Sequence, residues 1–170
     1  MVHAEDGRWI GRPLKRREDR RLLTGTGRYV DDIRPPGCAH VALLRSPHAH
    51  ARIVRVDVER AARAPGVVTV VTGAEVSHLA PMPVNRLVPD MRVPPHPIIA
   101  EARVHAAGTP VAAVVAESPW AARDALELID VAYEPLAALP EPEAAVADGA
   151  PVLFPDIERN RAFSTRPPRS

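Results

Sequence analysis

The sequence predicts an α+β fold in which mixed α/β layers pack a sheet against a few helices. Three observations predict it. Residues 54–59 alternate apolar and polar side chains with the period of a strand, residues 67–71 form a β-branched run, and residues 119–130 carry apolar side chains at helical spacing. Strands and helices therefore occur along one chain, which favours layers of both kinds.

The first element in the chain is a basic arm at residues 1–21. Seven of the fourteen residues from 8 to 21 are lysine or arginine, and such a run attracts phosphate. The whole chain, however, has 22 basic and 21 acidic residues and a net charge of +1. We therefore expect the arm to pack on a partner subunit, and we expect no nucleic-acid partner.

Three strands are expected between the arm and the middle of the chain. The apolar run at residues 41–44 and the alternating stretch at residues 54–59 predict a hairpin with Ser46 and Pro47 in its turn. The run at residues 67–71 is of the kind that is buried on both faces of a sheet.

The second half of the chain combines a loop, a helix and two further strands. Residues 81–97 contain six prolines in seventeen positions, which predicts an extended surface loop because proline cannot donate to a sheet ladder. Residues 110–117 predict a strand, and Ser118 with Pro119 predicts the start of a helix that runs to about residue 130. A last strand is expected at residues 131–136.

Length and composition define the class of protein. The 170 residues suit one domain, which we place at residues 22–155, between the arm at 1–21 and a polar C-terminal tail at 156–170. Cys38 is the only cysteine, which excludes an internal disulfide and a four-thiolate zinc or iron–sulfur site held by this chain alone. No stretch has the pattern of a membrane span or a secretion signal, so we expect a cytoplasmic protein with no membrane partner.

Two short motifs suggest a ligand, and each has a structural alternative. His48 and His50 would share one face of a strand and would ligate a metal if a third group joined them, but a structural turn explains the same residues. Gly25 and Gly27 suggest a phosphate loop, although no third glycine and no Lys-Ser pair follows. We expect no metal ligand and no cofactor-binding residue, and the sequence identifies no catalytic residue.

One group of residues is expected to face a partner. Asp31 and Asp32 are adjacent, so on an extended chain they point to opposite sides, which favours loop capping and an ion pair with an arginine over a shared proton. Arg28 and Tyr29 are expected to brace the same loop against a neighbouring domain. With Trp9, these four residues form the candidate partner interface.

Longer motifs carry a family resemblance over most of the chain. They are Trp9-Ile-Gly-Arg-Pro-Leu, Leu23-Thr-Gly-Thr-Gly-Arg-Tyr-Val-Asp-Asp32, Leu44-Arg-Ser-Pro-His-Ala-His-Ala-Arg-Ile53, Gly108-Thr-Pro-Val-Ala-Ala-Val-Val-Ala116 and Ala125-Leu-Glu-Leu-Ile-Asp-Val-Ala-Tyr-Glu-Pro-Leu136. In this order and spacing they resemble the a/b hammerhead domain of the large, molybdenum-bearing subunit of the xanthine dehydrogenase, aldehyde oxidase and aerobic carbon monoxide dehydrogenase family.

The resemblance implies a hammerhead-like domain that belongs to a molybdenum-dependent oxidoreductase. In that family the molybdopterin is held by glycine-rich loops in a region that follows the hammerhead domain, together with a glutamate that acts as the base. The residues after Phe163 supply none of these groups. We therefore expect no catalysis from this chain alone, and molybdopterin only on a partner chain.

Two functions from different classes follow. The first is a non-catalytic scaffold domain that completes a complex with the molybdopterin-binding chain of a split hydroxylase, or that associates with itself. The second is a freestanding domain put to new use, as a small metal-free acid–base enzyme of the isomerase or cyclase type, or as a protein that binds an apolar metabolite. Ala106 and Thr109 favour the second, because the family usually places an aromatic and an acidic residue there.

Overall fold

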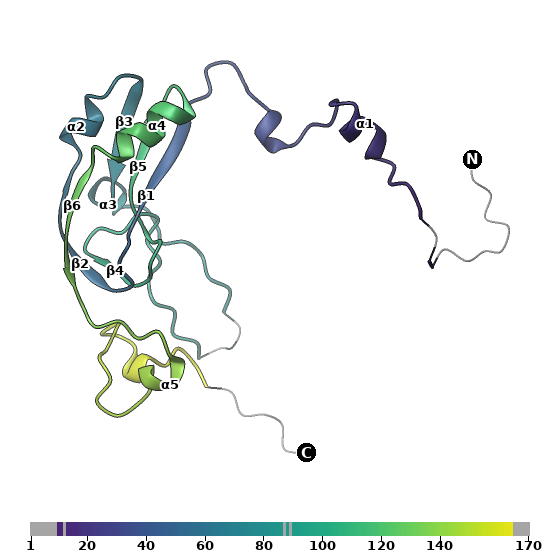
Figure 1. Ribbon diagram of the computed structural model, residues 1–170. Helices are drawn as coiled ribbons and strands as arrows, with labels where there is room; N and C mark the ends of the chain where they lie inside the picture. The colour runs from purple at the N-terminus through teal and green to yellow at the C-terminus, as the bar shows by residue number, and fades with distance from the viewer. Residues whose placement is uncertain (1–9, 12, 87, 89, 165–170) are drawn as a thin grey trace. The chain divides into compact units, whose positions relative to one another are not determined.

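The computed structural model describes residues 10–11, 13–86, 88 and 90–164, and the chain divides into two compact units, Met1–Cys38 and Ala39–Ser170 (Figure 1). The first unit contains helix α1 (Asp19–Leu23) and the short helix η1 (Val30–Asp32), and no residue of either helix is buried. The second unit contains all the described strands and both hydrophobic clusters. The expected mixed α/β class is confirmed.

The first sheet of the second unit is built around strand β5 (Pro110–Ala116). Its neighbours are β1 (His40–Arg45) and β3 (Val67–Thr72), and both pairings are antiparallel. Residues 111–114 of β5 are each at most 8 % exposed. The central strand is thus buried on both faces.

The second sheet is built around strand β2 (Ala51–Asp57). It lies between β4 (Arg103–Val104) and β6 (Asp130–Pro135), again with antiparallel pairing. Strand β4 has only two residues and forms one edge of this sheet.

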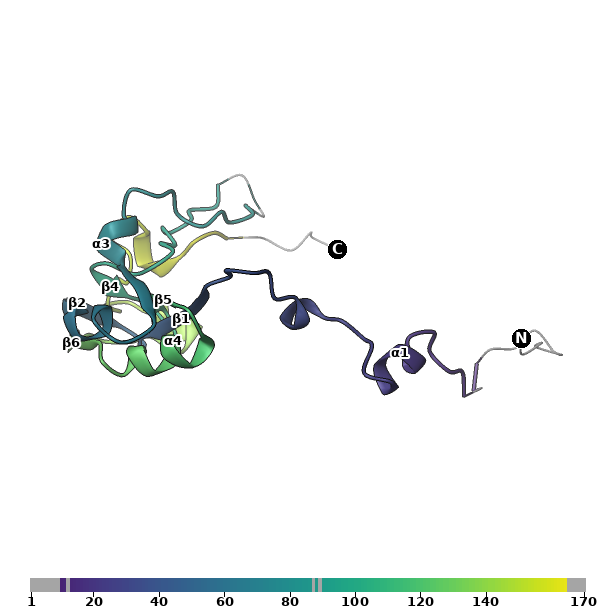
Figure 2. The same cartoon turned by 90° about the horizontal axis from the view of Figure 1, so that it is seen from above.

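Helix α4 (Pro119–Leu126) covers one face of the first sheet. The Ser118 hydroxyl accepts a hydrogen bond from the Ala121 backbone N–H at 3.1 Å, as expected for an N-cap. Ala122 and Ala125 are each 1 % exposed and pack in the same cluster as Val114 of β5. Figure 2 shows α4 and the short helix α3 (Gly73–Val76) on opposite sides of the strands. Helix α2 (Glu59–Ala62) contributes Ala61 to the α4 cluster.

Helix α4 ends earlier than the expected residue 130. The N–H groups of residues 127–129 each bond to the carbonyl three residues earlier, which tightens the chain into a turn. Asp130 then pairs with Asp57 of β2. Strand pairing therefore takes over at the point where helical spacing alone predicts another turn of helix.

The predicted hairpin between residues 41–44 and 54–59 is wrong. Both segments are strands, but β1 pairs with β5 and β2 pairs with β4 and β6. Ser46 and Pro47 follow β1, which belongs to the first sheet, and lead to β2, which belongs to the second. The expected hairpin turn is therefore a connection between two sheets. The Ser46 N–H donates to the Thr109 carbonyl at 2.9 Å. Each strand has an apolar partner far along the chain, and this pairing outweighs the local one.

The prediction that residues 67–71 are buried on both faces is also wrong. Strand β3 has one neighbour, and its Val68 is 61 % exposed. A register shift between Val67 and Thr69 places Val68 outside the regular pairing with β5.

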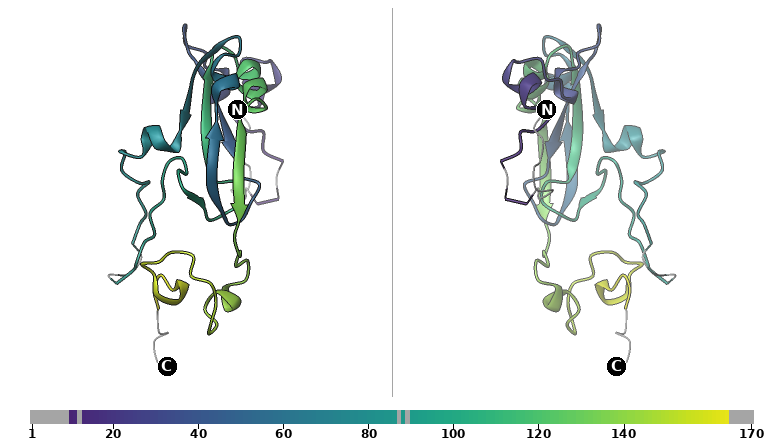
Figure 3. Two further views of the ribbon diagram at one scale, coloured as in Figure 1. Left: turned by 90° about the vertical axis from the view of Figure 1, so that its left-hand side faces the viewer. Right: turned by 90° about the vertical axis from the view of Figure 1, so that its right-hand side faces the viewer.

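Asn160 makes three of the hydrogen bonds that hold the C-terminal segment. Asn160, at the end of η2 (Glu158–Asn160), accepts from the Leu153 N–H at 2.8 Å and donates to the carbonyls of Ala145 and Pro151 at 2.9 and 2.8 Å. Its φ of 55° lies in the left-handed region that asparagine tolerates. Figure 3 shows this segment and helix α5 (Pro142–Ala145) beyond one end of the strands.

The loop at residues 81–97 contains no helix or strand among its described residues, as expected. It folds back on itself, because the Met82 N–H donates to the His96 carbonyl at 2.8 Å. Within the described parts of the chain, no helix is long and apolar enough to cross a membrane.

Candidate functional site

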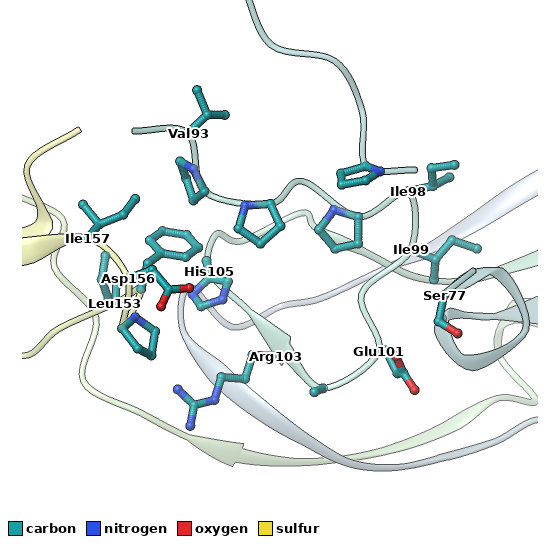
Figure 4. Close-up of a pocket in the computed structure, with 18 of the residues that line it drawn as sticks. Ser77, Val93, Ile98, Ile99, Glu101, Arg103, His105, Leu153, Asp156 and Ile157 are labelled. Atoms are coloured by element: carbon teal, nitrogen blue, oxygen red, sulfur yellow. The ribbon is translucent and has the colours of Figure 1, made fainter. Parts of the chain in front are cut away.

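A groove of about 800 Å³ lies in the second unit, beside the short strand β4. Figure 4 shows Val93 and Ile98 on one side of it and Glu101 and Arg103 on the other, with Leu153 and Ile157 at one end. Its volume falls in the range typical of ligand or peptide sites. Its apolar lining comes from the following residues: Val76, Leu79, Pro81, Val93, Pro94, Pro95, Pro97, Ile98, Ile99, Leu153, Phe154, Pro155 and Ile157.

The floor of the groove depends on a close backbone contact at Gly73. A Cβ atom at this position would lie 2.5 Å from the Ala100 carbonyl oxygen and 2.7 Å from the Glu101 Cα. Only glycine permits this approach, since real Cβ atoms do not come so near to backbone. Helix α3 and residues 98–101 are thereby held together below the groove.

Arg92 connects the proline-rich loop to the C-terminal end of the groove. Its backbone N–H donates to the Ala162 carbonyl at 2.9 Å, and its guanidinium lies 3.4 Å from the Asp156 carbonyl oxygen. Ile157, in the same segment, is only 5 % exposed. Residues of the loop and of the C-terminal segment therefore form one continuous wall.

The charged groups of the groove balance one another. Arg92 and Arg103 supply two positive charges, and Glu101 and Asp156 supply two negative charges. Neither an anion nor a cation is favoured by the lining as a whole. The apolar surface and the exposed backbone are therefore what a ligand would use.

Three neighbouring aromatic rings, those of His50, His105 and Phe154, connect the second sheet to the groove wall. The centroids of His50 and His105 are 5.3 Å apart in a stacked arrangement, and those of His105 and Phe154 are 4.3 Å apart. His50 donates through Nδ1 to the Ala137 carbonyl at 2.7 Å, because a carbonyl only accepts. His50 Nε2 and His105 Nδ1 are buried without a hydrogen-bond partner in the described part of the chain.

Burial lowers the pKa of His105 below its ordinary value of 6.5, and the nearby His50 and Arg103 lower it further. The neutral imidazole is thus the favoured form in the folded chain. Burial also raises the pKa of Tyr133, against a smaller opposite effect of its hydrogen bond with Ser46.

The two histidines of the Ser-Pro-His-Ala-His motif do not meet at one site. The ring of His48 lies edge-on to Tyr133 with centroids 4.8 Å apart, whereas His50 stacks on His105. Among the described residues, no cluster of three or more His, Cys, Asp or Glu side chains has the arrangement of a metal site. His96, within the proline-rich loop, is exposed.

Four of the five candidate interface residues, Arg28, Tyr29, Asp31 and Asp32, are described and lie in the first unit. Trp9 lies outside the described residues. Arg28 and Tyr29 are exposed, and Tyr29 is 65 % exposed. The Asp32 carboxylate accepts the Tyr29 backbone N–H at 2.8 Å, which is the capping role expected for this pair. No ion pair joins Asp31 or Asp32 to an arginine within the described residues. Their role at a partner interface stays a prediction.

The glycines of the same unit close a turn. The Gly27 N–H donates to the Arg21 carbonyl at 2.9 Å and the Gly25 N–H to the Leu22 carbonyl at 3.2 Å. These two amides therefore end helix α1 and do not converge on an anion.

The sequence did not identify the groove. Its walls come from residues 73–105 and 153–157, and no motif indicates that these two stretches meet. The one usable signal was the density of prolines at residues 81–97, since a proline-rich segment beside a fold presents rigid apolar surface without N–H donors. Asn160, which fixes the second stretch, had no recognisable pattern around it.

The comparisons with known proteins agree on the class of protein that this fold defines. The family described as aldehyde oxidase and xanthine dehydrogenase, a/b hammerhead domain, matches residues 24–137. The chain belongs to this family.

The relatives are much longer proteins. The 6-hydroxypseudooxynicotine dehydrogenase complex subunit gamma of Paenarthrobacter nicotinovorans is 42% identical over 155 residues, which are 86% of this chain and 19% of that protein. The carbon monoxide dehydrogenase large chain of Afipia carboxidovorans is 39% identical over 91% of this chain and 19% of its own length. The chain thus spans about a fifth of these curated relatives.

Solved structures show the same fold. Quinoline 2-oxidoreductase from Pseudomonas putida 86 has a TM-score of 0.72 and 46% sequence identity, and covers 78% of this chain and 17% of its own. The aldehyde oxidoreductase from Desulfovibrio desulfuricans has a TM-score of 0.76 at 26% identity over 91% of this chain and 18% of its own. The hammerhead domain predicted from the motifs is confirmed.

The groove does not fit molybdopterin, the cofactor that the family resemblance implies. A phosphate and a pterin ring require converging N–H donors, but the lining includes prolines 81, 94, 95, 97 and 155, which have no N–H. The two arginines of the lining are balanced by the Glu101 and Asp156 carboxylates, so the groove has no net positive charge for a phosphate. We therefore assign no chemistry of that cofactor to this site.

The close contact at Gly73 predicts a stability effect. Gly73→Ala should lower the free energy of unfolding by about 1–3 kcal/mol, because the new methyl group must displace the Ala100–Glu101 backbone. The measurement is urea unfolding followed by circular dichroism. Ala74→Ser, at the exposed neighbouring position of α3, is the control and should change stability by less than about 0.5 kcal/mol. A Gly73→Ala chain as stable as the wild type would contradict the contact.

The His105 environment predicts a pH dependence. The pKa of His105 is lower in the folded chain than in the unfolded chain, so between the folded value and 6.5 the unfolded chain binds more protons. The free energy of unfolding should therefore fall as the pH is lowered through this window, and His105→Gln should reduce that fall. Urea unfolding between pH 8 and pH 5 tests this, with the exposed His96→Gln as the control. Equal pH profiles for the wild type and His105→Gln would exclude the assignment.

Proposed function

We propose that this chain is a non-catalytic hammerhead scaffold that completes a molybdenum hydroxylase by burying its surface against the molybdopterin-bearing polypeptide. The observation that carries the proposal is the family match over residues 24–137 in a chain that spans about a fifth of its relatives. The names of those relatives describe a complex subunit and a large chain. In such a complex, this domain would pack against a polypeptide that corresponds to the remaining four-fifths of the relatives.

The first unit supports this proposal because it leaves its apolar side chains uncovered. Leu23 is 87 % exposed, Val30 is 82 % exposed and Ile33 is 64 % exposed. Neither α1 nor η1 buries a residue, so this segment has no core of its own. Exposed apolar side chains of this kind favour a protein interface, with Arg28 and Tyr29 among its contacts.

The charges of the arm are also consistent with a protein partner. Arg16 pairs with Asp19 at 3.0 Å, and Arg21 pairs with Glu18. Internal ion pairs of this kind reduce the positive charge that the arm offers to phosphate.

A second function has one observation in its favour. The groove of about 800 Å³ is large enough for a small apolar molecule, as in a freestanding metabolite-binding protein or a metal-free enzyme. His105 lines this groove, but burial lowers its pKa and so makes it a weaker base, and its Nδ1 is buried without a hydrogen-bond partner in the described part of the chain. The scaffold function therefore has the stronger support.

The test is co-expression of the tagged chain with the polypeptide encoded immediately downstream. The scaffold function predicts a stoichiometric complex in which molybdenum, measured by mass spectrometry, accompanies the second polypeptide. The tagged chain expressed without that polypeptide is the control. Unrelated downstream genes and a chain that purifies without a partner would contradict the proposal and favour the freestanding function.

A further inference from the structure

One edge of the second sheet is open along the groove. The sheet has the order β4-β2-β6, so β4 has a neighbour on one side only. Glu101, Arg103 and His105, which alternate along β4 and its extensions, all line the groove. A strand edge of this kind is a template for pairing with another chain unless something covers it.

The ladder geometry shows which backbone groups are open. The Ile53 N–H donates to the Ala102 carbonyl at 2.8 Å, and the register continues through Arg52 opposite Arg103. Alternate residues of an antiparallel strand direct their backbone groups to opposite sides. The N–H and C=O of Arg103 therefore point away from β2, and no hydrogen bond within the described residues uses either of them.

In the described residues, the opposite wall of the groove does not pair with this edge. Pro94, Pro95 and Pro97 lie in that wall and have no N–H to donate. Figure 4 shows the space between this wall, marked by Val93 and Ile98, and Arg103. The edge is therefore left open to a segment from outside the described chain.

We propose that the free edge of β4 receives an extended segment of the molybdopterin-bearing polypeptide as an added strand, with backbone hydrogen bonds to the N–H and C=O of Arg103. This inference rests on the proposed function and identifies the surface at which the two polypeptides meet. Strand addition of this kind derives affinity from main-chain hydrogen bonds and specificity from side-chain pockets. The apolar lining and the balanced charges select a segment of uncharged, apolar side chains.

A second copy of this chain fits the groove less well. In each copy, the β4 edge lies across the groove from the wall that contains Pro94, Pro95 and Pro97. Pairing the β4 edges of two copies would therefore bring two such walls into one groove. A single extended segment meets no such obstacle. The length of the relatives, of which this chain spans about a fifth, supplies abundant polypeptide for that segment.

The experiment compares Arg103→Pro with Arg103→Ala in the complex formed with the downstream polypeptide. Proline removes the outward N–H and leaves the bonds of Ala102 and Val104 to β2 in place, whereas alanine removes only the side chain. We expect Arg103→Pro to weaken the complex at least tenfold and Arg103→Ala to weaken it by less than about threefold. Circular dichroism and thermal unfolding report whether each variant is folded.

The outcomes separate this inference from the proposed function. A wild-type complex that Arg103→Pro leaves intact, or that both variants weaken equally, overturns the added strand but not the scaffold. Absence of a wild-type complex overturns both. A free chain that is dimeric and becomes monomeric in Arg103→Pro assigns the edge to a second copy, and overturns the proposed occupant.

A measurement on the wild type covers the case in which Arg103→Pro does not fold. Amide hydrogen exchange of the free and complexed chains reports on the Arg103 N–H directly. The added strand predicts at least tenfold slower exchange at Arg103 in the complex, and an unchanged rate overturns it.

Discussion

The close packing of strand β5 is the constraint on which the rest of the structure depends. Its residues 111–114 are at most 8 % exposed, and two of them are alanines. Val114 and Ala116 of β5 pack with Ala122 and Ala125 of α4, and the three alanines in this set allow the helix to approach the sheet closely. The same strand places Val114 in the α4 cluster and Val111 in the cluster of the second sheet. One strand therefore joins the two halves of the core.

The groove follows from the N-terminal end of this strand. The Ala100 N–H donates to the Pro110 carbonyl at 2.8 Å, which fixes residues 98–100 beside β5. Gly73 brings helix α3 against the same backbone. Once this segment is held, β4 begins at Arg103 with one side on β2 and the other facing the groove. An open strand edge is thus a consequence of how the core is packed, and it is the edge at which we propose that another polypeptide binds.

Local signals in the sequence predicted the elements better than their partners. Period-two alternation and the Ser118-Pro119 cap depend on neighbouring residues, and the strands and helix α4 were found where they indicated. The pairing of β1 with β5 depends on contacts between residues such as Leu44 and Ala112, far apart along the chain, which periodicity does not encode. The edge position of β3 is equally non-local. The family motifs identified the domain, because they extend over several elements at once.

The site was less accessible to prediction than the fold. Its polar residues, such as Glu101 and His105, belong to no motif that predicts a site. They line the same groove because every second residue along β4 and its extensions lies on the same side. The open N–H and C=O of Arg103 are main-chain groups, which nearly every residue has. No pattern of side chains in the sequence can therefore predict which of these groups stay unpaired. Only the pairing register shows that they point away from β2.

We propose that this domain supports a cofactor that another polypeptide holds. The most direct test is the molybdenum and pterin content of the chain purified alone, determined by mass spectrometry and by fluorescence of the oxidised pterin. We expect neither molybdenum nor pterin above background in the isolated chain. Tightly bound molybdenum in a one-to-one ratio with this chain, in the absence of any other protein, would contradict it.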